Sequence, residues 1–307
     1  MTFRLFCAIT ESKITIISEG TYMETRWTHR TSGNFAELRE ASKGVCVIPM
    51  GCVEKHGLHM ALGTDILMAS HIAYMASQLE TVTVFPDYIF GDVAERLNEH
   101  TEGSITLPVE TQFLMLEQLC DQIYINGFRK ILIYNAHGGN NSWLAAFIRN
   151  IDNKNKKYTV AKVFIEEQAP HIMAKKLLAE GNGAIPELNS DDEELLIKYH
   201  KEGMILGHAC FGEGSFMMGI APETMRLDLL GIESGLPTGA SAPYRKVGIE
   251  LKSGGWNIEF PNAYCGHDPY GMNERIGAAA LRMEAERLAR AIKFFKEDEG
   301  LLAAIDK

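Results

Sequence analysis

The chain lacks the features that mark nucleic-acid-binding and membrane proteins. Its 307 residues include 30 Lys and Arg but 40 Asp and Glu, giving a net charge of −10, whereas nucleic-acid-binding proteins usually have a basic balance. The longest stretch without a charged side chain, residues 131–148, has His, Gly and Asn in its middle, which excludes a lipid-spanning helix. We therefore expect no nucleic-acid partner and no membrane partner.

The chain also lacks a disulfide framework and a signal peptide. Its six cysteines, at positions 7, 46, 52, 120, 210 and 265, form no CxxC pair. Scattered cysteines are typical of reduced thiols in a cytoplasmic protein rather than of a zinc knuckle. The apolar run at the start of the chain is broken by Glu11 and Lys13, too early for a signal peptide. These observations predict a cytoplasmic protein.

The N-terminal segment, residues 1–30, fits poorly with the rest of the chain. Alternation at residues 14–17 favours an edge strand, while Met23 would serve equally well as a start, which would make residues 1–22 an addition to the native chain. We interpret residues 1–30 as an N-terminal extension or edge segment. Residues 31–307 are predicted to form one domain, because 46% of the chain is hydrophobic and can bury a full core.

Short apolar runs alternate with helical patterns from Gly44 onward. The expected strands cover residues 45–48, 81–85, 104–107, 131–134 and 158–165, and the expected helices cover 66–78, 110–126, 142–151, 189–201 and 271–296. This alternation predicts α/β architecture with parallel βαβ units. Ligands of such sheets bind beyond the carboxyl ends of the strands, so we expect the chemistry in the loops after Ile48 and Tyr134.

The loop after the first strand is rich in metal-binding side chains. Residues 54–65 contain two carboxylates, Glu54 and Asp65, and two imidazoles, His56 and His59. Neutral His and ionised carboxylates suit Zn²⁺, Mn²⁺ or Fe²⁺. The alternative is a solvated polar loop.

Two further stretches carry one imidazole each. His137 follows the strand at 131–134 in a loop with two glycines. This position is typical of a metal ligand and equally of a core or capping histidine. A phosphate cradle is a further alternative, although the glycine spacing matches no phosphate-binding motif. His208 and Glu213 lie five residues apart in the Gly-rich stretch 207–215. That stretch is predicted to be a loop, with or without a functional role.

Together these motifs resemble the creatininase family of metal-dependent amidohydrolases. The first block resembles E-x-H-G-x-H followed by T-D, the second N-x-H-G-G-N, and the third a His followed five residues later by E-T-S. The matching residues are Glu54, His56, Gly57, His59, Thr64 and Asp65, then Asn135, His137, Gly138, Gly139 and Asn140, then His208, Glu213 and Ser215.

The resemblance implies a three-layer α/β/α fold with a mainly parallel sheet, two divalent metal ions and a homo-oligomer, often a hexamer built from dimers. It assigns metal-ligand positions to Glu54, His56, Asp65 and His137, with Asp65 as the bridge and Glu213 as the fifth ligand. His208 matches the catalytic histidine, and His59 either supports a ligand or faces the substrate. We expect Zn²⁺ first, with Mn²⁺ and Fe²⁺ as alternatives.

Several positions depart from creatininase itself. A metal-binding Glu in its second loop is replaced here by Gly139, and the residue before the catalytic histidine is Gly207 instead of Glu. The Thr of E-T-S is Gly214, and no tryptophan occurs between Trp143 and Trp256, where creatininase has its lid tryptophans. The sequence therefore predicts that the metal site is kept, that the creatinine pocket is not, and that creatinine is a poor substrate.

The predicted activity is hydrolysis of a non-peptide C–N bond in a small cyclic amide or formamide. Metal ions activate water and polarise a carbonyl, and His208 is assigned the proton that the departing nitrogen needs. The alternatives are a metallopeptidase that trims a short peptide or peptide-derived cofactor, a metal-binding scaffold without turnover, and a nucleotide-binding module based on the glycine loop.

Overall fold

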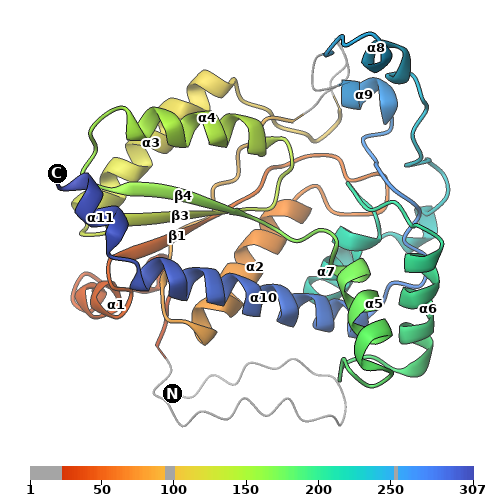
Figure 1. Cartoon of the computed structure of the whole chain (residues 1–307), viewed down its shortest axis with the longest axis horizontal. Coiled ribbons are helices and arrows are strands. Elements are labelled where there is room, and N and C mark those ends of the chain that lie inside the picture. Colours follow the sequence, from red (N-terminus) through yellow and green to blue (C-terminus); the bar gives the residue numbers. More distant parts are fainter. Residues whose placement is uncertain (1–22, 94–100, 252–254) are drawn as a thin grey trace.

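The computed structural model describes residues 23–93, 101–251 and 255–307 (Figure 1). Most of the predicted N-terminal extension, including the expected edge strand at 14–17, lies outside these residues. The part that is described runs along the edge of the sheet, where Arg26 pairs in parallel with Val84. Trp27 follows and packs against Phe35, with ring centroids 4.5 Å apart.

A parallel sheet of four strands forms the centre of the molecule, in the order β2-β1-β3-β4. The strands are β1 (Val45–Met50), β2 (Thr83–Val84), β3 (Lys130–Asn135) and β4 (Thr159–Phe164). The crossover helices are α2 (Thr64–Leu79), α3 (Val109–Ile125) and α4 (Asn140–Asp152). Parallel neighbours need such crossovers, so the expected βαβ units are present.

Helices cover both faces of the sheet because neighbouring strand residues point in opposite directions. Val45 and Val47 join a core with α2 and α10 (Glu274–Glu297), whereas Cys46 and Ile48 join a core with α3 and α4. Figure 1 shows these two helix pairs on opposite sides of the strands. The predicted three-layer α/β/α fold is confirmed.

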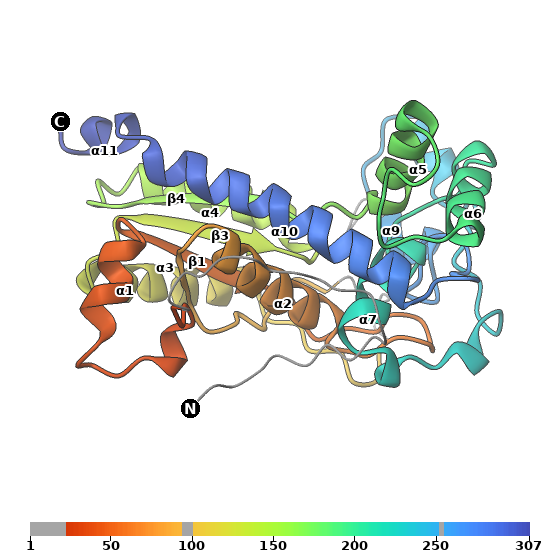
Figure 2. The same cartoon turned by 90° about the horizontal axis from the view of Figure 1, so that it is seen from below.

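The remaining helices are shorter, and several gather beyond the carboxyl ends of the strands (Figure 2). They are α1 (Phe35–Ala41), α5 (Ala169–Glu180), α6 (Ser190–Lys201), α7 (Phe211–Ile220), α8 (Ala242–Lys246), α9 (Trp256–Glu259) and α11 (Gly300–Ile305), with single 3-10 turns at Trp27–His29, Pro222–Thr224 and Leu227–Leu229. Helix α6 starts with a capping box, in which the Asn189 side chain accepts from the Asp192 N–H.

The predicted strand at 104–107 is wrong. Ile105 makes a single antiparallel bridge to Val53, and Thr106 a single parallel bridge to Gly91. This segment therefore fastens two loops of the site together instead of extending the sheet.

The predicted Gly-rich loop at 207–215 is also wrong in its second half, because α7 begins at Phe211. The glycines allow close packing of this helix. A Cβ at Gly212 would lie 2.4 Å from the Glu167 carbonyl oxygen, and one at Gly214 would lie 2.5 Å from the Met272 sulfur. Gly212 therefore needs glycine because a backbone atom occupies the space, whereas Gly214 packs against the end of a flexible methionine side chain.

Helices α7 and α10 cross at a second pair of glycines, which generates a stability prediction. A Cβ on Gly277 would lie 2.5 Å from both the Gly219 nitrogen and the Ser215 carbonyl oxygen. We expect Gly277→Ala to lower the free energy of unfolding by about 1–3 kcal/mol through overpacking, measured by denaturant titration. Gly300→Ala is the matched control, because its Cβ would meet nothing closer than 3.4 Å. Equal stability of the two variants would contradict this account of the crossing.

Candidate metal centre

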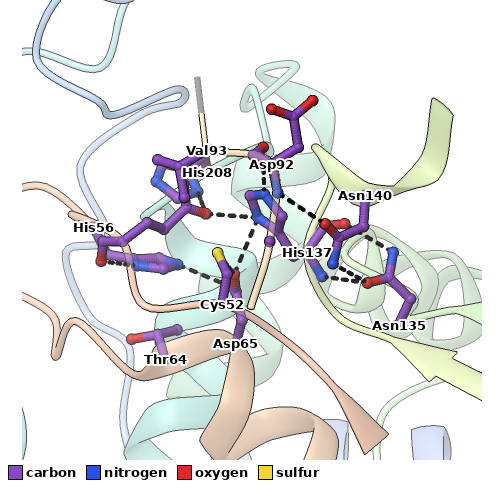
Figure 3. A network of polar contacts seen from close by, with 12 residues as sticks. Cys52, His56, Thr64, Asp65, Asp92, Val93, Asn135, His137, Asn140 and His208 are labelled. Atoms are coloured by element: carbon purple, nitrogen blue, oxygen red, sulfur yellow. Dashed lines mark hydrogen bonds and ion pairs between the residues drawn. The ribbon is translucent and has the colours of Figure 1, made fainter. Parts of the chain in front are cut away.

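Four separate segments converge at the carboxyl edge of the sheet (Figure 3). Glu54 and His56 follow β1, Asp65 lies in the first turn of α2, and His137 follows β3. Close packing at Gly51 brings the first two segments together, because a Cβ there would lie 2.5 Å from the Ile66 nitrogen. His208 lies in the loop before α7, and Glu213 lies in the first turn of α7.

A first donor group consists of Glu54, Asp65 and His137. The Nδ1 atom of His137 lies 2.8 Å from Oε1 of Glu54 and 3.2 Å from Oδ2 of Asp65. All three residues are at least 94% buried. Their oxygen and nitrogen atoms therefore share one small volume that is largely removed from solvent.

A second donor group consists of His56, Asp65 and Glu213. The Nε2 atom of His56 lies 3.1 Å from Oδ1 of Asp65 and 3.8 Å from Oε2 of Glu213. Asp65 belongs to both groups, with Oδ1 facing His56 and Oδ2 facing His137. A carboxylate in this position can bridge two cations.

Backbone carbonyl groups orient all three imidazoles toward the same centre. His137 donates from Nε2 to the Asp92 carbonyl over 3.0 Å, His56 from Nδ1 to the Glu54 carbonyl over 3.1 Å, and His208 from Nε2 to the Lys55 carbonyl over 2.8 Å. In each ring the nitrogen that faces the carboxylates is then the one that keeps a lone pair in the neutral form. This second contact is the usual device for aligning a metal-binding histidine.

The asparagines of the second motif hold the loop that carries His137. The Asn135 side chain donates to the His137 carbonyl oxygen over 2.8 Å, and its oxygen accepts from the His137 N–H over 3.2 Å. Asn140 accepts from the Asp92 N–H over 3.1 Å. The Asp92 carbonyl, which orients His137, is thereby fixed in turn.

Burial and charge act in opposite directions on the ionisable groups. Burial would raise the pKa of Asp65, but His56 and His137 hold it well below its ordinary value. Burial would lower the pKa of His56, yet Asp65 and Glu213 raise it to about 10. Burial raises the pKa of Glu213 in spite of His208 and His56. The buried carboxylates thus favour positive charge between them. Without a metal ion, protonated imidazoles supply that charge.

A cavity of about 470 Å³ opens onto both donor groups. Its lining includes Glu54, Asp65, His137, His208 and Glu213. Each donor group therefore reaches a space large enough for a small molecule.

His59 has a different environment from the other predicted site residues. It is 97% buried and donates from Nε2 to the Ala209 carbonyl oxygen over 2.8 Å, while its ring contacts Tyr264. Ala209 has a φ of +57°, so this bond holds a strained residue next to His208. Of the two roles predicted for His59, these contacts favour support over contact with substrate.

The sequence interpretation missed several residues of the site. Trp256, from α9, lines the cavity with its ring centroid 5.6 Å from that of His208. An aromatic wall is therefore present, although it comes from a later part of the chain than expected. Glu167 lines the same cavity, and its position just after β4 is a signal that could have found it. Cys52, two residues before Glu54, donates to Oδ2 of Asp65 over 3.3 Å.

The donor atoms fit a divalent cation. Oε1 of Glu54 is buried without a conventional hydrogen bond and has Nδ1 of His137 2.8 Å away, so its charge is compensated only when that imidazole is protonated or a cation lies between the two atoms. Imidazole nitrogens and carboxylate oxygens at separations of 2.8–3.8 Å suit a first-row divalent ion.

This fold and this donor set define the class of metal-dependent α/β/α hydrolases. The family model for creatininase, described as creatinine amidohydrolase, matches residues 28–292. The chain therefore belongs to the creatininase family, and the resemblance drawn from its motifs is confirmed. As a member of this family it is a hydrolase that acts on C–N bonds other than peptide bonds and uses divalent metal ions.

Two characterised relatives align with parts of the chain. A 2-amino-5-formylamino-6-ribosylaminopyrimidin-4(3H)-one 5'-monophosphate deformylase from Methanobrevibacter ruminantium is 28% identical over 177 residues, which cover 54% of this chain and 69% of the relative. A creatinine amidohydrolase from Pseudomonas putida is 24% identical over 113 residues, which cover 35% of this chain and 43% of that protein.

Solved structures share the fold over nearly the whole chain. A Bacteroides fragilis protein provisionally described as a creatinine amidohydrolase has a TM-score of 0.66 at 22% identity, covering 91% of this chain and 99% of that one. A mutant creatininase in a Zn–Zn form has a TM-score of 0.65 at 16% identity, covering 90% and 100%. These likenesses establish the fold.

Gly139 provides a test of how His137 is oriented. A Cβ there would lie 2.2 Å from the Asp92 carbonyl oxygen and 2.5 Å from His137 Nε2, the two atoms of the orienting hydrogen bond. We expect Gly139→Ala to weaken metal binding by about 10–100-fold, as loss of such a contact typically does, in a chelator-competition titration. Gly138→Ala is the matched control, since its Cβ would meet nothing within 4 Å. Unchanged affinity in the Gly139 variant would refute the role assigned to this bond.

Proposed function

We propose that the chain is a dinuclear metal hydrolase that cleaves the C–N bond of a formamide or small cyclic amide. The observation that carries the proposal is the shared position of Asp65, whose two oxygens face the two donor groups 3.1 and 3.2 Å away. A hydrolase with one ion would not need a second imidazole and a second carboxylate on the far side of Asp65.

In this proposal Glu54, Asp65 and His137 hold one ion, and His56, Asp65 and Glu213 hold the other. Zinc is the expected metal because mixed imidazole and carboxylate donors suit it, with Mn²⁺ and Fe²⁺ as alternatives. Divalent ions in such a site lower the pKa of bound water and polarise a carbonyl oxygen.

His208 is proposed to move the proton that amide cleavage requires. Its Nε2 donates to the Lys55 carbonyl, so Nδ1 faces the centre, 3.7 Å from Oε1 of Glu54 and 3.9 Å from Oε1 of Glu213. These distances are too long for hydrogen bonds. Nδ1 is therefore free to accept a proton and to deliver it to the departing nitrogen.

Two observations support a substrate other than creatinine. Gly139 cannot be replaced by the larger metal-binding Glu of creatininase without moving Asp92 or His137. The methanogen relative that removes a formyl group also aligns at higher identity, and over more of its length, than the creatinine amidohydrolase does. In the substrate named for that relative, the formyl group is carried by a nitrogen on a planar pyrimidinone ring.

The oligomeric state and the cellular location of the protein are part of the same proposal. Within the described residues, no helix combines the length and the apolar character needed to cross a membrane. We propose a cytoplasmic homo-oligomer, with a hexamer as one candidate form. The proposal treats residues 31–307 as one catalytic domain, in keeping with the span of the family match.

The test of the function begins with metal analysis of the purified protein. Two divalent ions per chain are expected, followed by release of formate or ring opening in a screen of formamides and cyclic amides with Zn²⁺, Mn²⁺ and Fe²⁺. Creatinine is expected to react below the usual enzymatic range of about 1–10³ per second. Absence of bound metal, or no hydrolysis of any such compound by the loaded protein, would overturn the proposal.

Substitutions of Glu213 and His208 are expected to impair hydrolysis in different ways. Glu213→Gln should release one of the two ions and abolish hydrolysis, because the variant removes an anionic donor while keeping an oxygen that can accept from the Ala209 N–H. His208→Ala should keep both ions and lower kcat by about 10²–10⁴-fold, the range for a general acid. Metal analysis and steady-state kinetics check both. Two ions per chain with normal turnover in the Gln variant would refute the role of Glu213.

Trp256 is expected to act on substrate binding rather than on metal binding. Its ring lines the cavity beside His208, where a planar substrate could stack against it. Trp256→Ala should raise KM by about 2- to 12-fold, since stacked aromatic pairs contribute about 0.5–1.5 kcal/mol, while both ions stay bound. Trp256→Phe should retain most of the affinity, and an unchanged KM in the Ala variant would argue against stacking.

A further inference from the structure

Cys52 offers a fourth donor atom to the first donor group. Its side chain is fully buried, and its sulfur lies 3.3 Å from Oδ2 of Asp65. The ligand atoms of Cys52, Glu54, Asp65 and His137 all lie within 4.8 Å of one another. Figure 3 shows the sulfur beside Asp65, on the side of the ring of His137. Cys52 thus lies in the same pocket as the three predicted ligands.

The fold fixes Cys52 in this place from two directions. Cys52 and Glu54 are two residues apart on either side of Val53, which is bridged to Ile105, and side chains with this spacing in an extended chain point to the same side. Gly91 closes the other side, because a Cβ there would lie 2.5 Å from Cβ of Cys52 and 3.0 Å from Cδ2 of His137. The thiol therefore has little room to turn away from the donor group.

The four side chains supply donor types that zinc accepts in proteins. With zinc–ligand distances of 2.0–2.3 Å, neighbouring donors around a tetrahedral ion lie about 3.3–3.6 Å apart. The sulfur of Cys52 and Nδ1 of His137 lie 3.3 and 3.2 Å from Oδ2 of Asp65. A small expansion of the group would accommodate the ion.

We propose that the Cys52 thiolate is a ligand of the ion held by Glu54, Asp65 and His137. This inference rests on the dinuclear centre of the proposed function. When the ion binds, a sulfur–metal bond replaces the S–H bond and the proton passes to solvent. The resulting sulfur, nitrogen and two-oxygen set binds zinc or cadmium in preference to manganese, because thiolate is a soft ligand. The second group, without sulfur, discriminates less strongly against manganese.

A competing role for Cys52 is that of a hydrogen-bond donor that only supports Asp65. Cys52→Ser distinguishes the two, since a serine hydroxyl can also donate to Oδ2 of Asp65 but is a far weaker ligand for a soft ion. For a supporting donor, the Ser variant keeps its zinc and cadmium affinity. For a ligand, it loses more than the about 10–100-fold that removal of a supporting contact costs, and manganese affinity changes much less.

Cobalt substitution provides a direct spectroscopic test in the full chain. Co²⁺ bound to a thiolate shows an intense near-ultraviolet charge-transfer absorption that nitrogen and oxygen ligands do not produce. We expect this band in the Co²⁺-loaded protein and its loss in Cys52→Ser. Cys265→Ser is the matched control, because Cys265 also lines the cavity but belongs to none of the donor groups found in the described residues. The band should survive in this control.

The outcomes separate this inference from the function on which it rests. Two cobalt ions per chain without a charge-transfer band would overturn the role of Cys52 and leave the dinuclear centre intact. If the band is lost in Cys265→Ser and kept in Cys52→Ser, the cobalt ligand is Cys265, and the inference is overturned. Absence of bound cobalt in the wild-type chain would count against the dinuclear centre itself. A band lost only in Cys52→Ser supports the proposal.

Discussion

The site depends on the burial of three carboxylates, Glu54, Asp65 and Glu213, in one place. Like charges removed from water repel one another strongly, and each carboxylate loses hydration that the protein must replace. Three imidazoles supply the compensation, and each is aimed at the carboxylates because a backbone carbonyl engages its other nitrogen. Since those carbonyls belong to loops fastened to the sheet, the rings have little freedom to turn away. The arrangement is therefore ready to exchange protons for divalent ions without rebuilding the loops.

Close packing at glycine positions makes this convergence possible. At Gly51 the end of β1 lies directly against the start of α2, which places Asp65 beside the residues that follow the strand. At Gly212 the first turn of α7 approaches the Glu167 backbone so closely that no side chain fits, and at Gly214 it packs against the end of the Met272 side chain. Helix α7 can thereby deliver Glu213 from a part of the chain about 150 residues away from Asp65. The precision of the site is thus a property of backbone contacts as much as of the side chains themselves.

The differences from creatininase form a consistent set. In the loop after β3, Gly139 stands in place of a metal-binding Glu of creatininase. The Asp92 carbonyl lies against Gly139 and leaves no space for a carboxylate side chain. A carboxylate reaches the second donor group from α7 instead, and an aromatic wall reaches His208 from Trp256 of α9. In the proposed function, the metal ligands and the residue that contacts the substrate therefore come from different elements. This separation is a physical route by which one metal centre can serve different amides.

The sequence by itself determined the alternation of strands and helices and the two strand-end loops that carry Glu54, His56 and His137, because periodicity and strand-end position are local properties. It could not decide whether 207–215 is a loop or the start of a helix, since glycine lowers helix propensity and only packing against Glu167 and Met272 explains its presence there. It also could not place Trp256 beside His208. That proximity, like the nitrogen that each imidazole presents, results from contacts between residues far apart in the chain, and only the tertiary structure decides them.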